Sequence, residues 1–220
     1  MKMFKWLIAS ALLGASWGCG PVEQQQEGEL GKGVFTYRCA TAAADLQCDP
    51  YTDPTAFPEH MAVGSTMILD YDANEGSTAG VAPASPDFAE SQGNGQFKLV
   101  KAGQIAFVAR AFGEVVDFIH LDVQPIADVV VFDETGERQR TLDLKTGAAS
   151  ELWARVVDAR QIRLSGALSY TWSIEHPAVA ELSEDEGHGQ VTITPKAAGE
   201  STVSIEVEGQ LFELPLTVTD

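Results

Sequence analysis

The sequence has little positive charge and no long stretch with the periodicity of a helix. It contains 14 Lys and Arg residues against 32 Asp and Glu residues, a formal net charge of −18 at pH 7. A chain this acidic repels the phosphates of nucleic acids, so we expect no nucleic-acid partner. The missing helical pattern argues against α/β enzyme folds. The acidic residues are scattered rather than gathered in blocks, which favours solubility over cation binding as their role.

The N-terminal apolar segment is too short to cross a membrane as a helix. It runs from Trp6 to Trp17, about 12 residues, whereas a hydrocarbon core needs about 20. A cationic start with Lys2 and Lys5 precedes it and small residues follow, which is the layout of a secretory signal peptide. Residues 1–18 are therefore predicted to be an export signal.

The end of this segment, Gly18-Cys19-Gly20, resembles a bacterial lipoprotein signal. In that family a small residue precedes a cysteine that receives lipid and becomes the new N-terminus. Ser16 and Trp17 depart from the family's usual Leu and small residue, which leaves an ordinary signal peptide with an incidental cysteine as the alternative. The resemblance implies a lipid on Cys19 that anchors the protein in the cell envelope. Gly20 implies the outer membrane, with the protein facing the periplasm or the outside.

Cysteine is scarce, with only Cys19, Cys39 and Cys48 in the chain. An odd cysteine in an exported protein needs an explanation, and lipidation of Cys19 leaves an even pair. In an oxidising compartment Cys39 and Cys48 are expected to form a local disulfide. Closing so short a loop contributes about 2 kcal/mol by the loop-entropy argument. A metal site is disfavoured because no nearby His or Cys completes a set of four ligands.

Two halves of the sequence match each other with a period of about 95 residues, which indicates a duplicated domain rather than a solenoid. The matching segments begin at Pro86 and Pro177, at Gly93 and Gly187, and at Lys101 and Ala197. In both halves apolar residues alternate with polar ones, as in Val203, Ile205 and Val207. Such alternation places the apolar side chains on one face of a half-buried strand. Glycine turns separate these runs, for example Phe112-Gly113 and Glu208-Gly209.

Short alternating strands with regular turns predict an all-β protein made of two tandem immunoglobulin-like β-sandwich domains. We place the first domain at residues 34–125 and the second at residues 126–220. Residues 19–33 are polar and contain glycine, so we expect a flexible tether there.

Four segments of the second half carry a more specific resemblance. They are Trp172-Ser-Ile, Pro177-Ala-Val-Ala-Glu-Leu182, Gly189-Gln-Val-Thr192 and Ala198-Gly-Glu-Ser-Thr-Val203. Residues 126–220 thereby resemble a bacterial Ig-like domain of group 2, with a weaker copy at residues 30–125 that lacks an equivalent of Trp172. The resemblance implies surface display, adhesion or spacing, and it brings no catalytic residues. Trp172 is expected to be the large apolar anchor between the two sheets.

The strongest candidate for metal binding is the segment Asp70-Tyr-Asp-Ala-Asn-Glu-Gly. Oxygen ligands from Asp70, Asp72 and Asn74 at alternate positions suit calcium. Glu75 and Val81 occupy the places where a regular EF-hand loop needs Gly and Glu, so only a looser calcium loop is possible. The alternative is a polar strand end and turn. No other cofactor is expected.

The residues reveal no grouping of acid, base and nucleophile that would carry catalysis. Gly14-Ala-Ser-Trp-Gly18 has the spacing of a hydrolase nucleophile elbow but lies in the export signal. We therefore expect a non-catalytic, lipid-anchored envelope protein that binds or displays a partner, either an envelope protein or a polysaccharide. A structural spacer without a ligand is the main alternative. A hydrolase would require reactive side chains that converge in one pocket.

Overall fold

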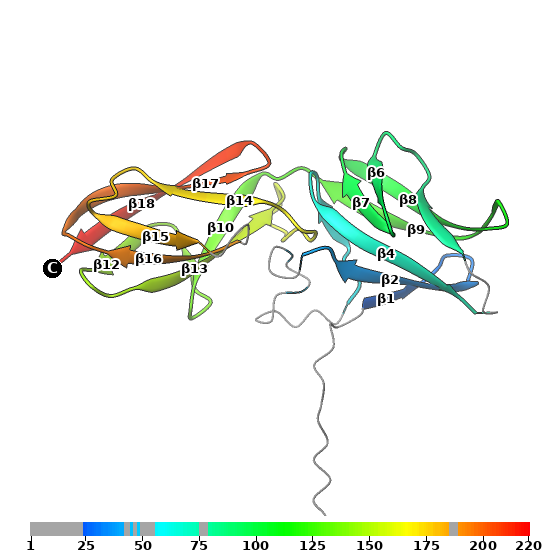
Figure 1. Cartoon of the computed structure of the whole chain (residues 1–220), viewed down its shortest axis with the longest axis horizontal. Coiled ribbons are helices and arrows are strands. Elements are labelled where there is room, and N and C mark those ends of the chain that lie inside the picture. Colours follow the sequence, from blue (N-terminus) through cyan, green and yellow to red (C-terminus); the bar gives the residue numbers. More distant parts are fainter. Residues whose placement is uncertain (1–23, 42–44, 46–47, 49–55, 75–78, 185–188) are drawn as a thin grey trace, which may run out of the picture.

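The described part of the chain is built from strands (Figure 1). The computed structural model describes residues 24–41, 45, 48, 56–74, 79–184 and 189–220. Those residues contain eighteen strands and no α-helix, so no helix among them is long and apolar enough to cross a lipid bilayer. The prediction of an all-β protein with two Ig-like sandwiches is confirmed.

Nine strands form the first sandwich. They are β1 (Gln24–Glu27), β2 (Gly33–Cys39), β3 (His60–Ala62), β4 (Thr66–Ala73), β5 (Gly80–Pro83), β6 (Ala89–Gly93), β7 (Gln96–Leu99), β8 (Gly103–Ala111) and β9 (Glu114–Gln124). One sheet has the order β1-β2-β4-β7-β6 and the other the order β3-β9-β8-β5. Neighbouring strands are antiparallel except β3, which runs parallel to β9.

The core of the first sandwich lies between its two sheets. The alternating residues Ile105, Phe107 and Ala109 of β8 are buried there, as the pattern predicted. Aromatic side chains fill the centre: the rings of Phe97 and Phe107 meet edge-on, with centroids 5.1 Å apart. Such tilted aromatic pairs add to the stabilisation that comes from burying their apolar area.

Nine further strands form the second sandwich. They are β10 (Asp128–Asp133), β11 (Arg138–Gln139), β12 (Leu142–Lys145), β13 (Ser150–Val157), β14 (Tyr170–Ile174), β15 (Ala180–Glu184), β16 (Gln190–Pro195), β17 (Gly199–Val207) and β18 (Gln210–Thr219). The sheet orders are β11-β10-β13-β16-β15 and β12-β18-β17-β14. Strand β12 runs parallel to β18.

Trp172 on β14 lies in the core of this second sandwich, only 5% exposed. It pairs across the sheet with Ile205 of β17, which is also buried. The indole therefore occupies the place between the sheets that the sequence analysis gave it. Burial of so large a side chain is a major contribution to a core of this size.

The two sandwiches have the same connectivity. The order β2-β4-β7-β6 corresponds to β10-β13-β16-β15, and β3-β9-β8-β5 corresponds to β12-β18-β17-β14. Single turns also match: the amide of Gly64 donates to the carbonyl of Leu99, and the amide of Gly147 donates to that of Pro195. Eight strands of each sandwich therefore have an equivalent in the other, whereas β1, which precedes β2, and β11, which follows β10, do not correspond.

The expected tether at residues 19–33 is wrong for part of its length. Residues Gln24–Glu27 form β1, which pairs with β2 along its whole length. The pairing uses backbone groups, which polar residues supply as well as apolar ones. Residues 19–23 lie outside the described residues.

Asp117 holds the turn between β1 and β2 against β9. Its carboxylate is fully buried and accepts hydrogen bonds from the amides of Leu30 and Lys32, each at 2.9 Å. The amide of Phe118 and the hydroxyl of Tyr71 also donate to it. A buried carboxylate with four donors satisfies a turn that is otherwise short of acceptors.

Candidate functional site

Two of the predicted cysteines are bonded to each other, and the third lies outside the described residues. Cys39, at the end of β2, forms a disulfide with Cys48, with Cα atoms 6.2 Å apart. Cys19 lies outside the described residues, so its lipidation stays a prediction.

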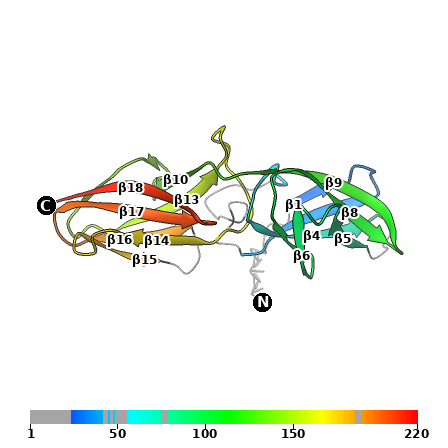
Figure 2. The same ribbon diagram turned by 90° about the horizontal axis from the view of Figure 1, so that it is seen from above.

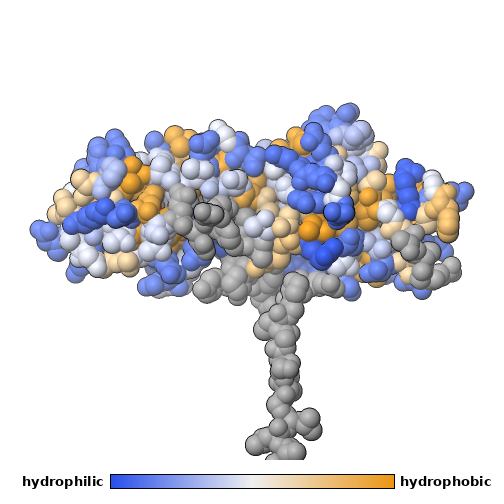
Figure 3. Space-filling model, viewed as in Figure 1, coloured by the Kyte–Doolittle hydropathy of each residue, from blue (hydrophilic) through white to orange (hydrophobic). Residues whose placement is uncertain are grey.

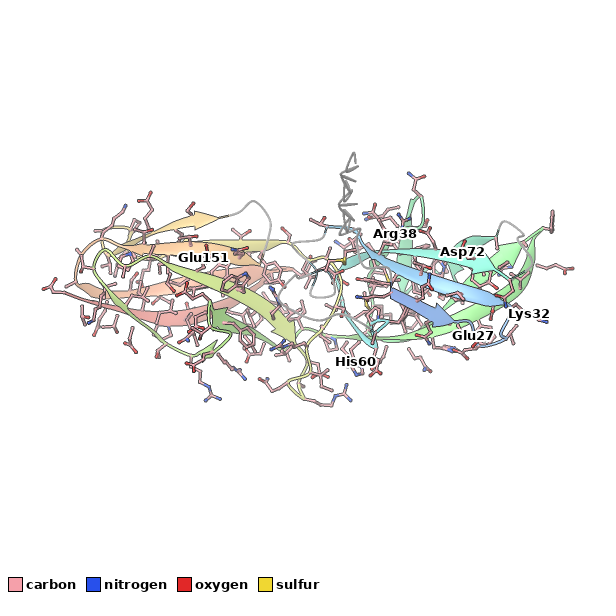
Figure 4. The ribbon with its side chains drawn as sticks, turned by 90° about the horizontal axis from the view of Figure 1, so that it is seen from below. Glu27, Lys32, Arg38, His60, Asp72 and Glu151 are labelled. Atoms are coloured by element: carbon pink, nitrogen blue, oxygen red, sulfur yellow. A yellow bond between two sulfur atoms is a disulfide. The ribbon has the colours of Figure 1, made fainter. Side chains whose placement is uncertain are left out.

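The calcium candidates lie along β4 and in the turn that follows it. Asp70 forms an ion pair with Arg38 of the neighbouring strand β2. The side-chain amide of Asn74 donates to the carbonyl of Gly31 at 3.3 Å. Asp72 is exposed on the same side of the strand as Asp70. Figure 4 labels both Asp72 and Arg38. Among the described residues no three His, Cys, Asp or Glu side chains are grouped to hold a metal ion.

A cavity of about 460 Å³ lies beside these residues, next to the start of β7 at Gln96, where β7 does not cover the edge of β4 beyond Ile68. Thr36, Arg38, Asp70 and Asp72 contribute to its lining. The Arg38 guanidinium already neutralises part of the acidic charge, which weakens the argument for a calcium ion. Calcium binding here stays a hypothesis.

The two sandwiches are joined by backbone pairing, in addition to the chain that connects them. Ser165 and Ala167, in the loop between β13 and β14, form four backbone hydrogen bonds of 2.9–3.0 Å with the first sandwich. Their partners are His60, Ala62 and Thr66. The loop of the second sandwich therefore acts as a short extra strand against the first. We call this contact the joint (Figures 1 and 2).

Asp45 ties the joint together from the first sandwich. It is 2% exposed, and one carboxylate oxygen accepts a hydrogen bond from the amide of Gly166 at 3.0 Å. The other oxygen accepts from the Tyr37 hydroxyl. Burial and the neighbouring carboxylate raise the pKa of Tyr37 well above its usual value, so this hydroxyl remains a donor at neutral pH. A buried carboxylate bonded to both units favours one fixed arrangement of them.

Gly166 allows the close approach of the two units. Its φ of +101° is in the region that favours glycine, and a Cβ atom there would lie 2.2 Å from the Ser65 hydroxyl oxygen. Asp158 shapes the turn just before it, by accepting the amides of Arg160 and Ile162 at 2.8 Å. The loop is thus bent by its own residues before it reaches the first sandwich.

The hairpin between β17 and β18 also touches the first sandwich at the joint. Glu208 lies over Gly64, where an added Cβ would be 2.6 Å from the Glu208 Cγ atom. Its carboxylate is 3.9 Å from the ammonium group of Lys98. The same residues border a cavity of about 310 Å³ between the sandwiches.

The opposite end of the first sandwich carries exposed apolar side chains. Phe112, at the tip of the β8–β9 hairpin, is 101% exposed, and Leu30 and Val115 are 52% and 43% exposed. Leu30 belongs to the turn that Asp117 holds against the start of β9, so the three residues share one end. We call this end the apolar end. Lys32 lies in the same turn as Leu30, and Figure 4 shows it far from His60, which lies at the joint. Figure 3 shows hydrophobic colouring at this end among hydrophilic residues.

Phe112 stands in an unusual backbone conformation for a large side chain. Its φ is +52° and that of Gly113 is +86°, the pattern of a type I′ turn, which favours Asn-Gly. The β6–β7 hairpin has Asn94-Gly95 at its tip, and the β17–β18 hairpin, which is equivalent to β8–β9, has Glu208-Gly209, both with similar angles. An aromatic residue at this position is costly for the fold and exposed to water, which points to a role outside the fold.

Sequence reasoning missed the residues of the joint and of the apolar end. Phe112 did have a signal, because the repeat aligns Phe112-Gly113 with Glu208-Gly209 and shows an aromatic residue where its partner has a charge. Asp45 and Gly166 had none, since their contact joins residues 121 positions apart.

Comparison with known proteins identifies no family. No protein-family model matches the chain, and neither does any curated protein. Among solved structures, an S-layer protein SbsC fragment is 14% identical with a TM-score of 0.36, over 70% of this chain and 23% of its own length. The Escherichia coli adhesin FdeC is 18% identical with a TM-score of 0.33, over 74% and 62%. The Yersinia pseudotuberculosis adhesin InvE is 16% identical with a TM-score of 0.31, over 74% and 57%. Values this low support no inference about activity.

Proposed function

We propose that the chain is a non-catalytic protein of the bacterial cell envelope, anchored by a lipid on Cys19. In this proposal its two sandwiches act as one rigid arm that presents the apolar end to a partner. The export signal and its cysteine support the envelope location. The observation that carries the proposal is the joint, where Ser165 and Ala167 pair with the first sandwich and Asp45 bonds to both units.

Rigidity is the property that separates an arm from two loosely connected domains. Domains in tandem move relative to each other unless the contact between them is extensive or specific. Here Ala62 of the first sandwich is fully buried and belongs to the core cluster of the second. Ile126 of the connecting chain is buried in the same cluster. Shared core residues and strand pairing oppose bending at the joint.

The apolar end favours a binding arm over a spacer without a ligand. In a spacer a fully exposed phenylalanine would contribute nothing, because its ring stays in contact with water. An interaction surface exposes apolar side chains that become buried in the complex. Phe112, Leu30 and Val115 provide such a group at the end farthest from the joint. Their apolar character fits a protein partner better than a polysaccharide, which presents mainly hydroxyl groups.

Gly166→Ala is expected to loosen the arm without unfolding either sandwich. The added methyl group collides with Ser65 and forces the loop off the first sandwich. We expect a wider distribution of distances between spin labels placed on the two sandwiches, and a larger spread of shapes in solution scattering. The unchanged chain should give one narrow distance distribution.

Gly136→Ala is the matched control, because Gly136 also has a positive φ, of +81°, but nothing lies within 4 Å of its added Cβ. An alanine there is also strained by the positive φ, but it meets no neighbour, so the distance distribution should stay narrow. An equally broad distribution in the unchanged chain and in Gly166→Ala would show that the joint does not hold the units together.

Cys19→Ser is expected to release the protein from the membrane fraction. Serine cannot accept the thioether-linked lipid, and the apolar run of about 12 residues is too short to span the bilayer as a helix. We expect the unchanged protein in the membrane pellet and the variant in the soluble envelope fraction. Cys48→Ser, which leaves Cys19 intact, should remain in the membrane pellet. Retention of Cys19→Ser in that pellet contradicts the anchor.

A further inference from the structure

We propose that the apolar end of the first sandwich docks, head to tail, on the second sandwich of another copy of the chain. The docking surface is the end of the second sandwich that lies opposite the joint, around Gly147, and we call it the free end of that sandwich. This rests on the proposed function, because it names the partner of the binding end. The molecule's own joint supports this contact, because each free end is the structural equivalent of one side of the joint.

The apolar end corresponds to the side of the joint that the second sandwich provides. Strand β9 starts at the apolar end and β18 starts at the joint, and the two strands are equivalent. The hairpin residue Glu208, which lies over Gly64 in the joint, corresponds to Phe112. In the first sandwich this position has no neighbouring domain to contact, and its side chain is fully exposed.

The free end of the second sandwich corresponds to the side of the joint that the first sandwich provides. Gly64, which receives Glu208, corresponds to Gly147, as their matching hydrogen bonds to Leu99 and Pro195 show. Both glycines have a positive φ, of +89° and +79°. Nothing lies within 4 Å of an added Cβ at Gly147, whereas the Glu208 side chain occupies that space at Gly64.

The two free ends are chemically suited to each other. Four exposed residues around Gly147 are small and apolar, namely Ala148, Ala149, Ala197 and Ala198, and the exposed side chains of Lys145, Thr146 and Lys196 border them. Small side chains leave a shallow surface on which the ring of Phe112 can lie flat and lose its contact with water. A charged residue in place of Phe112 would not gain from such a surface, which accounts for the difference from Glu208.

A head-to-tail contact of this kind does not close on itself. One copy uses both ends, so association extends to a third copy and beyond. The contact is expected to be weak, because it is small and lacks the connecting chain that raises the effective concentration at the joint. Copies held on one membrane surface would meet at a much higher local concentration than copies in solution.

The test uses sedimentation velocity on residues 19–220 with Cys19→Ser, which contain every described strand. We expect the sedimentation coefficient to rise over about a hundredfold increase in concentration, the range that distinguishes a weak association from none. Phe112→Asn should abolish the rise. It should not lower the melting temperature, because Asn-Gly is the favoured pair for a type I′ turn.

Ala148→Glu tests the other face and should abolish the rise as well, because it places a charge beside Gly147. Leu211→Asn is the control: Leu211 is 62% exposed but lies away from both faces, and the rise should remain. Phe112→Asn and Ala148→Glu each keep one intact face, so their mixture should form dimers and nothing larger.

Each other outcome overturns the proposal. If the chain stays monomeric throughout the concentration range, a second copy is not the partner. If Phe112→Asn abolishes association but Ala148→Glu does not, the apolar ends meet each other instead. In either case the outcomes for Gly166→Ala and Cys19→Ser are unaffected, so a failure here is separable from a failure of the rigid, anchored arm.

Discussion

Replacing Trp172 with alanine is expected to lower the free energy of unfolding of the second sandwich by about 3–5 kcal/mol. The indole is buried between the two sheets, and its removal loses both the transfer free energy of the ring and the contacts of its neighbours. Urea unfolding followed by fluorescence measures the effect directly. Residues 19–220 contain two tryptophans, Trp153 and Trp172, and both lie in this sandwich, so Trp153 reports on the variant.

Trp153→Ala is the matched control for this experiment. Trp153 is on β13 with its side chain only half buried, between the buried residues Leu152 and Ala154. It therefore faces away from the core, and its loss should cost about 1 kcal/mol. Unfolding of Trp153→Ala is followed through Trp172. Equal losses in the two variants would mean that Trp172 is not the anchor of this core.

Asp117→Ala is expected to lower the free energy of unfolding of the first sandwich by about 2–4 kcal/mol. The substitution leaves the partly buried amides of Leu30 and Lys32 without their acceptor. It also removes the contact that holds the β1–β2 turn on β9, so we expect faster amide hydrogen exchange in that turn. Calorimetry or circular dichroism measures the stability.

The same carboxylate makes the stability of the first sandwich depend on pH. Burial raises the pKa of Asp117, but the hydrogen bonds from Leu30, Phe118, Lys32 and Tyr71 outweigh it, and the pKa in the folded chain is lowered. In the unfolded chain it is about 3.9. The stabilisation is therefore complete above the unfolded-state pKa and is lost as the pH falls through the folded-state pKa.

Asp117→Asn keeps the shape and removes the titration. Its stability should fall less steeply below about pH 4 than that of the unchanged chain. Glu114→Gln removes an exposed carboxylate from the same strand and should leave the slope unchanged. If Asp117→Asn loses stability with acid as steeply as the unchanged chain does, other carboxylates dominate the acid response.

Alternation determined the fold class from the sequence. Val203, Ile205 and Val207 predicted the buried face of β17, and all three are buried in the structure. The repeat predicted two sandwiches of the same connectivity, which the sheet orders confirm. The buried face of a strand can be predicted from the sequence because its side chains alternate with a period of two, independently of the rest of the chain.

Local composition led to a wrong prediction in the segment expected to be a tether. Polar residues such as Gln24 cannot build a core, yet Gln24–Glu27 form an edge strand, because β2 offers backbone donors and acceptors that no composition reveals. Asp70, Asp72 and Asn74 have the spacing of calcium ligands, but the fold places Arg38 beside Asp70 and Gly31 beside Asn74. The order of residues along a chain does not specify their neighbours across a sheet.

The sequence by itself determined the two sandwiches, their apolar faces and the core position of Trp172, because each depends on residues close together in the chain. Only the tertiary structure decided that Asp45 and Gly166 meet at the joint, that Asp117 holds a distant turn, and that Phe112 is left bare at one end. Those facts depend on the packing of segments far apart in sequence, where a single buried carboxylate or a missing Cβ decides which surfaces can approach.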